Sequence, residues 1–272
     1  MNWFQKVFNL YISSSIHVSL AILSFSILTY FEHGLSLDRN FLLFVFFAGI
    51  TGYNFVKYSG IAQLHHLSLT PNLRLIQIFS FFCFIAMCDF AWHLAWRTWV
   101  AGGILGLLTA LYAVPVSGKN LRNLSGMKIF IIAIVWAGST VILPLIEADK
   151  LLDMEILVDF VQRFMLVLAL TLPFEIRDLK FDDEELGTIP QQLGLWETKI
   201  FGTILFLLIF LIELFQKDFS SDYFIATSFV CLLGAFFLWN SRLDQHKYYA
   251  SFWVEAAPIA YLGFYWFLRN FL

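Results

Sequence analysis

Charged residues are scarce in this sequence. Lysine, arginine, aspartate and glutamate together make up 14% of its 272 positions, whereas 60% of the residues are hydrophobic. Soluble domains carry about 25% charged and 45–50% apolar residues, and a fold in water could not hide this much apolar surface. The scarcity of charge excludes a soluble globular enzyme, a disordered protein and a nucleic-acid-binding protein. It indicates an integral membrane protein in contact with lipid.

Cysteine is also rare. Cys83, Cys88 and Cys231 all lie in apolar runs, without the spacing of a disulfide framework or a metal site, so we expect small apolar core residues. The alternating pattern of a membrane β-barrel is absent as well, which leaves α-helices as the spanning elements.

Long apolar runs are what the sequence does contain. A helix needs about 20 mostly apolar residues to cross the hydrocarbon core, and nine such stretches are present. They cover residues 10–31, 41–61, 73–94, 98–115, 128–146, 156–173, 199–216, 223–240 and 249–268. Nine spans with their connections fill the chain. We therefore expect an all-α, polytopic membrane protein with a single nine-helix transmembrane domain over residues 1–272.

The positive charges are unevenly distributed between the connections. With the N-terminus inside, eleven lysines and arginines fall in inner segments and five in outer ones, and Arg163 lies within the sixth stretch. Positive charge accumulates on the cytoplasmic side of membrane proteins. We expect a cytoplasmic N-terminus, a C-terminus outside, and a location in the bacterial inner membrane. The polar loops after the second and sixth stretches are then cytoplasmic.

Acidic residues are concentrated in one place. Six of the 20 fall within residues 175–185, just beyond the sixth predicted span. Glu175, Asp178 and Asp182 are spaced i, i+3 and i+7, so on a helix their carboxylates line one face at the membrane surface. Three such carboxylates repel one another unless a cation lies among them. Carboxylate and phosphate oxygens are the ligands that Mg²⁺ prefers.

Two basic residues are interleaved with these acids. Arg177 and Lys180 are placed to reach the oxygens of a bound diphosphate. A solvated acidic loop is the alternative interpretation of the same charge pattern. The proline at 173 and the following sequence Gly-Thr-Ile-Pro at 187–190 argue against a simple solvated loop.

The segment around these acids resembles a known motif. Residues 171–194 read TLPFEIRDLKFDDEELGTIPQQLG. This resembles the UbiA superfamily of intramembrane prenyltransferases, whose second aspartate motif is DxxxD followed by a GxxTxPxxLG-like stretch. Asp178 and Asp182 match the aspartates, Glu175 extends the motif upstream, and residues 187–194 resemble the second part.

A second stretch is similar to the same family. Tyr112 to Pro115 looks like its tyrosine/proline segment, and Lys119, Arg122 and Lys128 look like its basic loop between helices four and five. Nine helices with a cytoplasmic N-terminus and polar loops after helices two and six also match the family architecture. The resemblance covers most of the chain, although only residues 171–194 are specific.

The resemblance implies transfer of a prenyl group from a polyprenyl diphosphate to a hydrophobic acceptor, aromatic or lipid. It implies Mg²⁺ held by Glu175, Asp178 and Asp182, with Asp178 and Asp182 catalytic. A dry, aromatic-rich cavity would stabilise the allylic cation as the diphosphate departs. The residues expected to contact the diphosphate are Asn54, Tyr58, Lys119, Arg122, Arg177 and Lys180. No protein partner is expected.

The family's first motif, NDxxDxxxD at the end of helix two, is missing here. Aligned on Asn54, its three aspartates become Phe55, Tyr58 and Ala62. Sliding the alignment does not restore the motif, because no acidic residue occurs between positions 38 and 89. One of the family's two metal sites has therefore lost its carboxylates.

Two interpretations of this loss stay open, and they differ in the role of Lys57. In the first, which we favour, Lys57 is a catalytic residue that supplies the positive charge of the missing metal, leaving one Mg²⁺ site. In the second, the chain is a catalytically impaired protein that binds an isoprenoid or another lipid. Lys57 can also be a snorkelling residue at a helix end. A transporter is a third, less favoured function, because the polar ends of the second and sixth apolar stretches lie on the same side of the membrane.

Overall fold

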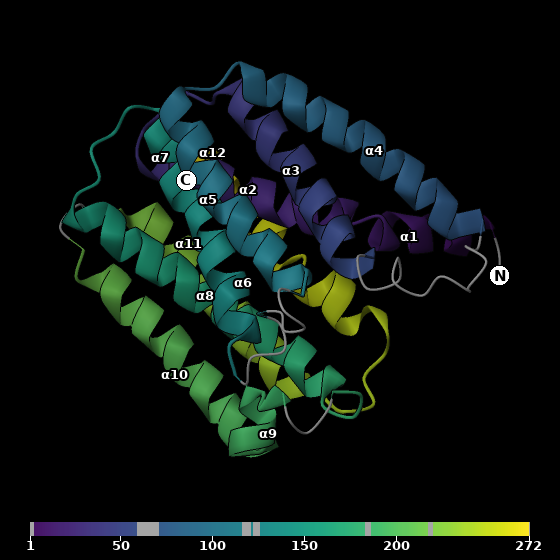
Figure 1. Cartoon of the computed structure of the whole chain (residues 1–272). Coiled ribbons are helices and arrows are strands. Elements are labelled where there is room, and N and C mark those ends of the chain that lie inside the picture. Colours follow the sequence, from purple (N-terminus) through teal and green to yellow (C-terminus); the bar gives the residue numbers. More distant parts are fainter. Residues whose placement is uncertain are drawn as a thin grey trace.

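A computed structural model describes residues 3–58, 71–115, 121, 126–182, 186–216 and 220–271. The regular elements in these ranges are helices (Figure 1). The α-helices are α1 (Trp3–Ser13), α2 (Ile16–Glu32), α3 (Arg39–Tyr58), α4 (Pro71–Trp92), α5 (Trp96–Ala113), α6 (Lys128–Ala137), α7 (Leu143–Glu147), α8 (Met154–Asp178), α9 (Ile189–Leu193), α10 (Leu195–Leu214), α11 (Ser221–Asn240) and α12 (Ala257–Phe271). Two π-helical segments, Gly138–Ile142 and Tyr249–Val254, precede α7 and α12. The all-helical class is confirmed.

Six helices of the described ranges are long and apolar enough to cross a membrane. They are α3, α4, α8, α10, α11 and the continuous run Lys128–Glu147 that joins α6 to α7, and the bent pair of α1 and α2 makes a seventh. The predicted stretches 98–115 and 249–268 are helical as well. However, α5 begins with Trp96 and Arg97, and α12 has 15 residues. The count of nine spans stays a prediction.

The first predicted span is not one straight helix. Its two parts, α1 and α2, meet at 52°, and Ser15 between them has φ of +64°, in the left-handed region. Three consecutive serines precede α2, and serine hydroxyls compete with helical hydrogen bonding. Two side chains of α3 bind backbone carbonyls at this junction. The Asn54 amide donates to the Ser14 carbonyl and the Tyr58 hydroxyl to the Ser13 carbonyl, each at 3.0 Å.

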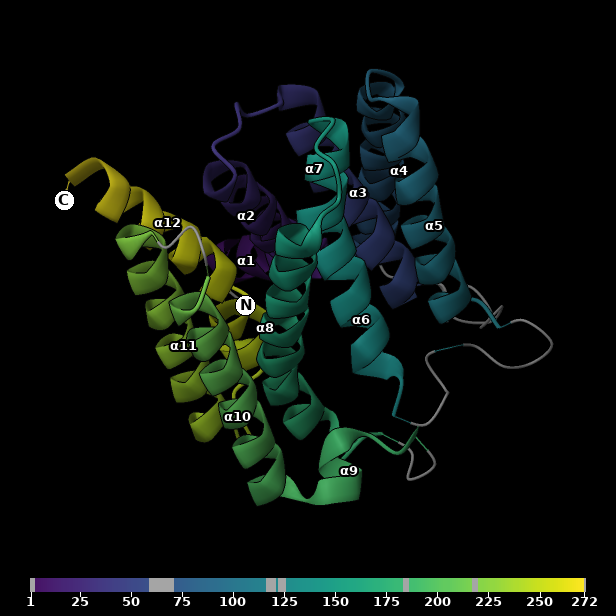
Figure 2. The ribbon, with the colours of Figure 1, turned by 90° about the vertical axis from the view of Figure 1, so that its left-hand side faces the viewer.

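Helix α8 lies in the middle of the bundle, between α6 and the pair α10 and α11 (Figure 2). It continues to Asp178, beyond the predicted end of the sixth span at Pro173. The carbonyl of Pro173 accepts a hydrogen bond from the Gln245 side chain at 3.1 Å. The helix is heavily buried, so packing outweighs the one backbone hydrogen bond that proline removes. Glu175, Arg177 and Asp178 therefore belong to the last turn of α8.

Candidate functional site

An apolar cavity of about 630 Å³ lies between α2, α3, α4, α5 and the run from α6 to α7. Tyr53 of α3 and Trp136 of α6 line it, and the indole donates a hydrogen bond to the tyrosine hydroxyl at 2.7 Å. Glycines widen it. A Cβ atom at Gly52, Gly103 or Gly106 would meet no atom within 4 Å. The lining of the cavity is mostly apolar, which suits an apolar ligand.

One end of this cavity adjoins charged side chains. Lys57 follows Tyr53 by one turn of α3, and Lys128 precedes the lining residue Ile131 by one turn of α6. Tyr112 of α5 also lines the cavity and interacts electrostatically with both Tyr53 and Lys128. The apolar chamber therefore ends where α3 and α6 each carry a lysine.

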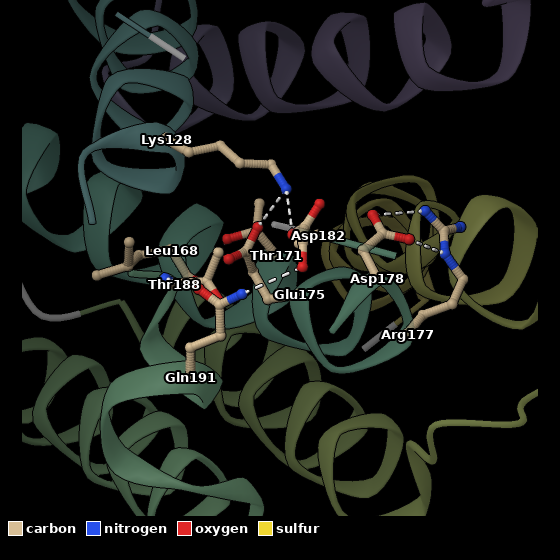
Figure 3. Close-up of polar contacts among 9 residues, drawn as sticks. All are labelled: Lys128, Leu168, Thr171, Glu175, Arg177, Asp178, Asp182, Thr188 and Gln191. Atoms are coloured by element: carbon tan, nitrogen blue, oxygen red, sulfur yellow. Dashed lines mark hydrogen bonds and ion pairs between the residues drawn. The ribbon is translucent and has the colours of Figure 1, made fainter. Parts of the chain in front are cut away.

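Lys128 connects α6 to the acidic segment (Figure 3). Its ammonium lies 2.9 Å from a Glu175 carboxylate oxygen and 3.3 Å from an Asp182 oxygen. The Glu175 side chain is 3% exposed, and those of Lys128 and Asp182 are 16% and 15% exposed. Two of the three predicted carboxylates thus converge in a largely buried place, on a cation that the chain itself supplies.

The third carboxylate, Asp178, has a different partner. Both of its oxygens face Arg177, with the guanidinium Nε–H at 2.7 Å from one and the NH2 nitrogen at 3.0 Å from the other (Figure 3). Its charge still interacts with that of Glu175. The predicted single helical face is only partly present, because α8 ends at Asp178 and Asp182 belongs to the turn that follows.

The donor set at this site fits a cation. An ammonium already lies between Glu175 and Asp182, in the place where a metal ion would neutralise them. Within the described ranges, the acidic group whose ligand atoms lie within 4.8 Å of one another is a different one, Glu32, His33 and Asp159. Asp159 is about 24 Å from Glu175 along α8, from a rise of about 1.5 Å per residue. The predicted Mg²⁺ site stays a prediction.

The stretch that follows the acids turns back toward them as α9. Gly187 and Gly194 flank this helix with φ of +52° and +93°, a conformation that glycine adopts without the cost of a Cβ atom. The Gln191 side chain accepts from the Thr188 backbone N–H at 2.8 Å and donates to the Asp182 carbonyl at 3.5 Å. Gln191 thus links the start of α9 to the backbone of Asp182 (Figure 3).

The predicted site residues of α3 contact the junction of α1 and α2. The Lys57 ammonium donates to the Ser15 hydroxyl at 2.9 Å, and that hydroxyl donates to the Asn54 side-chain oxygen at 2.8 Å. Asn54 and Tyr58 also bind the carbonyls of the junction. These bonds give each of the three residues a structural partner, and their contact with a diphosphate stays a prediction.

Glu255 interacts with charged residues of both α3 and α8. It follows the π-helical segment before α12, and its carboxylate interacts electrostatically with both Lys57 and Arg177. Glu255 is not among the residues predicted for the site, and Lys128 is predicted only as part of a basic loop. An acid inside a predicted span was the available signal for Glu255. No spacing rule signals the pairing of Lys128 with Glu175.

Among the remaining predicted diphosphate ligands, the structure describes only Lys180, and it lies away from the acidic residues. The Lys180 ammonium lies 2.6 Å from the carboxylate of Asp244, at the surface. Lys119 and Arg122 lie outside the described residues. Of the predicted set, the structure brings Glu175, Arg177, Asp178 and Asp182 into one neighbourhood.

The arrangement of helices is similar to that of a solved membrane enzyme. The structure of digeranylgeranylglyceryl phosphate synthase, a UbiA-superfamily prenyltransferase, aligns with a TM-score of 0.57 over 94% of this chain and 95% of that chain. The chain has a UbiA-type fold. At 15% identity the likeness establishes the fold alone. No model of a protein family and no curated protein sequence matches the chain.

Proposed function

We propose that this protein binds a polyprenyl diphosphate and transfers its prenyl group to a hydrophobic acceptor, aromatic or lipid. The observation that carries the proposal is the apolar cavity with charged groups at one end. A prenyl diphosphate has the same division, a long apolar tail and a strongly charged head. The tail occupies the cavity, and the head lies at the ends of α3, α6 and α8.

The charges at this end support a metal-bound diphosphate. Among the described residues there are three cations, Lys57, Lys128 and Arg177, against four carboxylates, Glu175, Asp178, Asp182 and Glu255. A diphosphate anion needs further positive charge to bind there. Mg²⁺ held by Glu175, Asp178 and Asp182 would supply that charge and stabilise the departing diphosphate.

The side chains around the cavity carry the rest of the proposed chemistry. The apolar walls exclude water, so that an allylic cation meets the acceptor before it meets hydroxide. Tyr53 and Trp136 present aromatic surface, which attracts a cation. Lys57 and Arg177 face the head group from α3 and α8. Lys119 and Arg122 remain expected contributors from the loop before α6.

We further propose a membrane topology to go with this activity. Nine spans, with α5 and α12 joining the seven candidates, place the N-terminus in the cytoplasm and the C-terminus outside. The charged end of the cavity then faces the cytoplasm, in a bacterial inner membrane. The polar connections after α3 and α8 carry the head-group contacts on that side.

Binding without catalysis is the second candidate function. Two observations favour it. Asn54, Lys57 and Tyr58, which occupy the place of the missing first motif, already bind the α1–α2 junction. No acid lies in the sequence there to hold a second metal ion. A protein of this kind would hold an isoprenoid in the cavity and release no diphosphate.

Radiolabelled polyprenyl diphosphate, given to the purified protein with and without Mg²⁺, separates these functions. The transferase proposal predicts saturable binding and Mg²⁺-dependent release of inorganic diphosphate. Saturable binding without release would instead identify an isoprenoid-binding protein. Uptake into sealed vesicles would identify a transporter, and an absence of saturable binding would contradict both the transferase and the binding protein.

A further inference from the structure

Lys128 occupies a position that a sequence motif assigns to a metal. Its ammonium lies between Glu175 and Asp182, two members of the predicted Mg²⁺ ligand set. A metal ion and the Lys128 ammonium compete for this place, because two positive charges a few ångströms apart repel each other. Pairing with Lys128 therefore opposes the binding of a metal ion by these carboxylates.

Lys128 is also well placed to reach the head group of a ligand in the cavity. It begins α6, and Ile131 and Ile132 of the next turn line the cavity. Its long side chain is 16% exposed, so its ammonium is not sealed in. A lysine ammonium is a mobile point charge on a flexible stem, and it binds phosphate oxygens readily.

We propose that Lys128 is a built-in counter-ion, which competes with a divalent metal for Glu175 and Asp182 and moves to the diphosphate when the metal binds. The proposal rests on the proposed function for the identity of the anion. Without ligands, Lys128 neutralises two buried carboxylates that would otherwise repel each other. With ligands, the metal takes over the carboxylates, and Lys128 adds its charge to the head-group site.

Movement of Lys128 from the carboxylates to the diphosphate predicts an effect on ligand affinities that a purely structural salt bridge would not produce. Removing the Lys128 charge leaves the carboxylate pair more negative, which strengthens metal binding. The same change removes a cation from the diphosphate site, which weakens binding of the prenyl diphosphate. One substitution therefore shifts the two affinities in opposite directions.

The experiment measures Mn²⁺ binding by the full chain in nanodiscs of a neutral lipid, with free Mn²⁺ read by electron paramagnetic resonance and no diphosphate present. We expect Lys128→Met to bind Mn²⁺ about tenfold more tightly than the wild type. Lys128→Arg keeps the charge and should match the wild type. Lys199→Met is the matched control, because Lys199 lies near the start of α10 and donates to the carbonyls of Trp239 and Ser241 rather than to an acid.

The second measurement is the affinity for geranylgeranyl diphosphate at saturating Mn²⁺. Lys128→Met should bind it more weakly than the wild type, while Lys199→Met binds it equally well. Equal or weaker Mn²⁺ binding by Lys128→Met would overturn the competition. If the wild type binds Mn²⁺ but no geranylgeranyl diphosphate, the proposed function and the transfer of Lys128 to the head group both fail, while the Mn²⁺ result still decides the competition.

Loss of Lys128 leaves Glu175 buried without a counter-charge, and the variant can be unstable. The proposal then predicts that Mn²⁺ raises the unfolding temperature of Lys128→Met by more than it raises that of the wild type, because the metal replaces the missing charge. An equal or smaller increase contradicts the proposal.

Discussion

The Lys128 ammonium lies 2.9 Å from the carboxylate of Glu175, and this contact joins the first turn of α6 to the last turn of α8. The Glu175 side chain is almost completely buried. A buried carboxylate without a partner is costly, so the two residues depend on each other. The pair also fixes the place where the cavity meets the acidic segment.

The pair of Lys128 and Glu175 predicts how variants of these residues rank by their free energy of unfolding. Lys128→Met should lower the free energy of unfolding by about 3 kcal/mol, since it leaves a buried charge uncompensated. Glu175→Gln should cost less, because Lys128 keeps Asp182 as a partner. The double variant Lys128→Met/Glu175→Leu should be more stable than Lys128→Met alone. Unfolding in detergent without divalent metal, followed by circular dichroism, measures the series. A double variant less stable than Lys128→Met would show that the buried charge is not what costs stability.

If the cavity binds the prenyl chain, a substitution that fills the cavity should weaken that binding. Gly106 lies on α5 in the cavity wall, with open space where a Cβ atom would be. Gly106→Leu should lower the affinity for geranylgeranyl diphosphate about tenfold or more, because the leucine side chain occupies the volume of the tail.

Gly263 provides the matched control for that substitution. It is also a helical, exposed glycine with nothing within 4 Å of its Cβ position, but it belongs to α12 and does not line the cavity. Gly263→Leu should leave the affinity unchanged. Equal effects of the two substitutions would mean that the prenyl chain binds elsewhere.

The α1–α2 junction offers a way to separate two roles of Lys57. If Lys57 only holds the junction, Lys57→Met and Ser15→Gly should behave alike, because each removes the bond between the two side chains. If Lys57 supplies charge to the head group, Lys57→Met alone should weaken diphosphate binding. Ser15→Gly suits the test, since Ser15 has φ of +64° and glycine tolerates that conformation. We expect weaker binding only for Lys57→Met. The same loss in both variants would assign Lys57 to the junction.

Arg163 is predicted to stabilise the opposite end of the bundle and to take no part in binding. It is 4% exposed, donates to the Phe25 carbonyl at 3.0 Å, and interacts with the carboxylate of Glu32. Arg163→Leu should cost about 3 kcal/mol or more of stability. Arg97→Leu breaks an exposed pair with Asp149 and a contact with the Trp96 ring, and should cost less than about 1 kcal/mol. Thermal unfolding compares the two. A loss of prenyl diphosphate binding in well-folded Arg163→Leu would contradict the assignment.

The helical class and the position of the acidic segment can be predicted from the sequence, because both depend on local patterns. Apolar runs of spanning length reveal α3, α8, α10 and α11 directly. The spacing of Glu175, Asp178 and Asp182 locates the site at one end of α8. These features need no knowledge of which helices are neighbours.

Contacts between residues far apart in the chain could not be predicted from the sequence pattern. Lys128 lies 47 residues before Glu175 in the chain, and only the packing of α6 against α8 brings them together. The bend at Ser15 follows from hydroxyls that interrupt a helix, and the side chains of α3 that hold it come from a different span. Pro173 indicates a helix end, yet burial of α8 carries the helix through to Asp178.

The most direct test of the account is photo-crosslinking with a polyprenyl diphosphate that carries a diazirine on its tail, followed by peptide mapping. If the cavity holds the prenyl tail, cavity residues in α3, α5 and α6 should be labelled, and unlabelled polyprenyl diphosphate, but not the corresponding alcohol, should abolish the labelling. Labelling confined to the lipid-facing surface of α10 and α11, or labelling that the unlabelled diphosphate does not reduce, would contradict it.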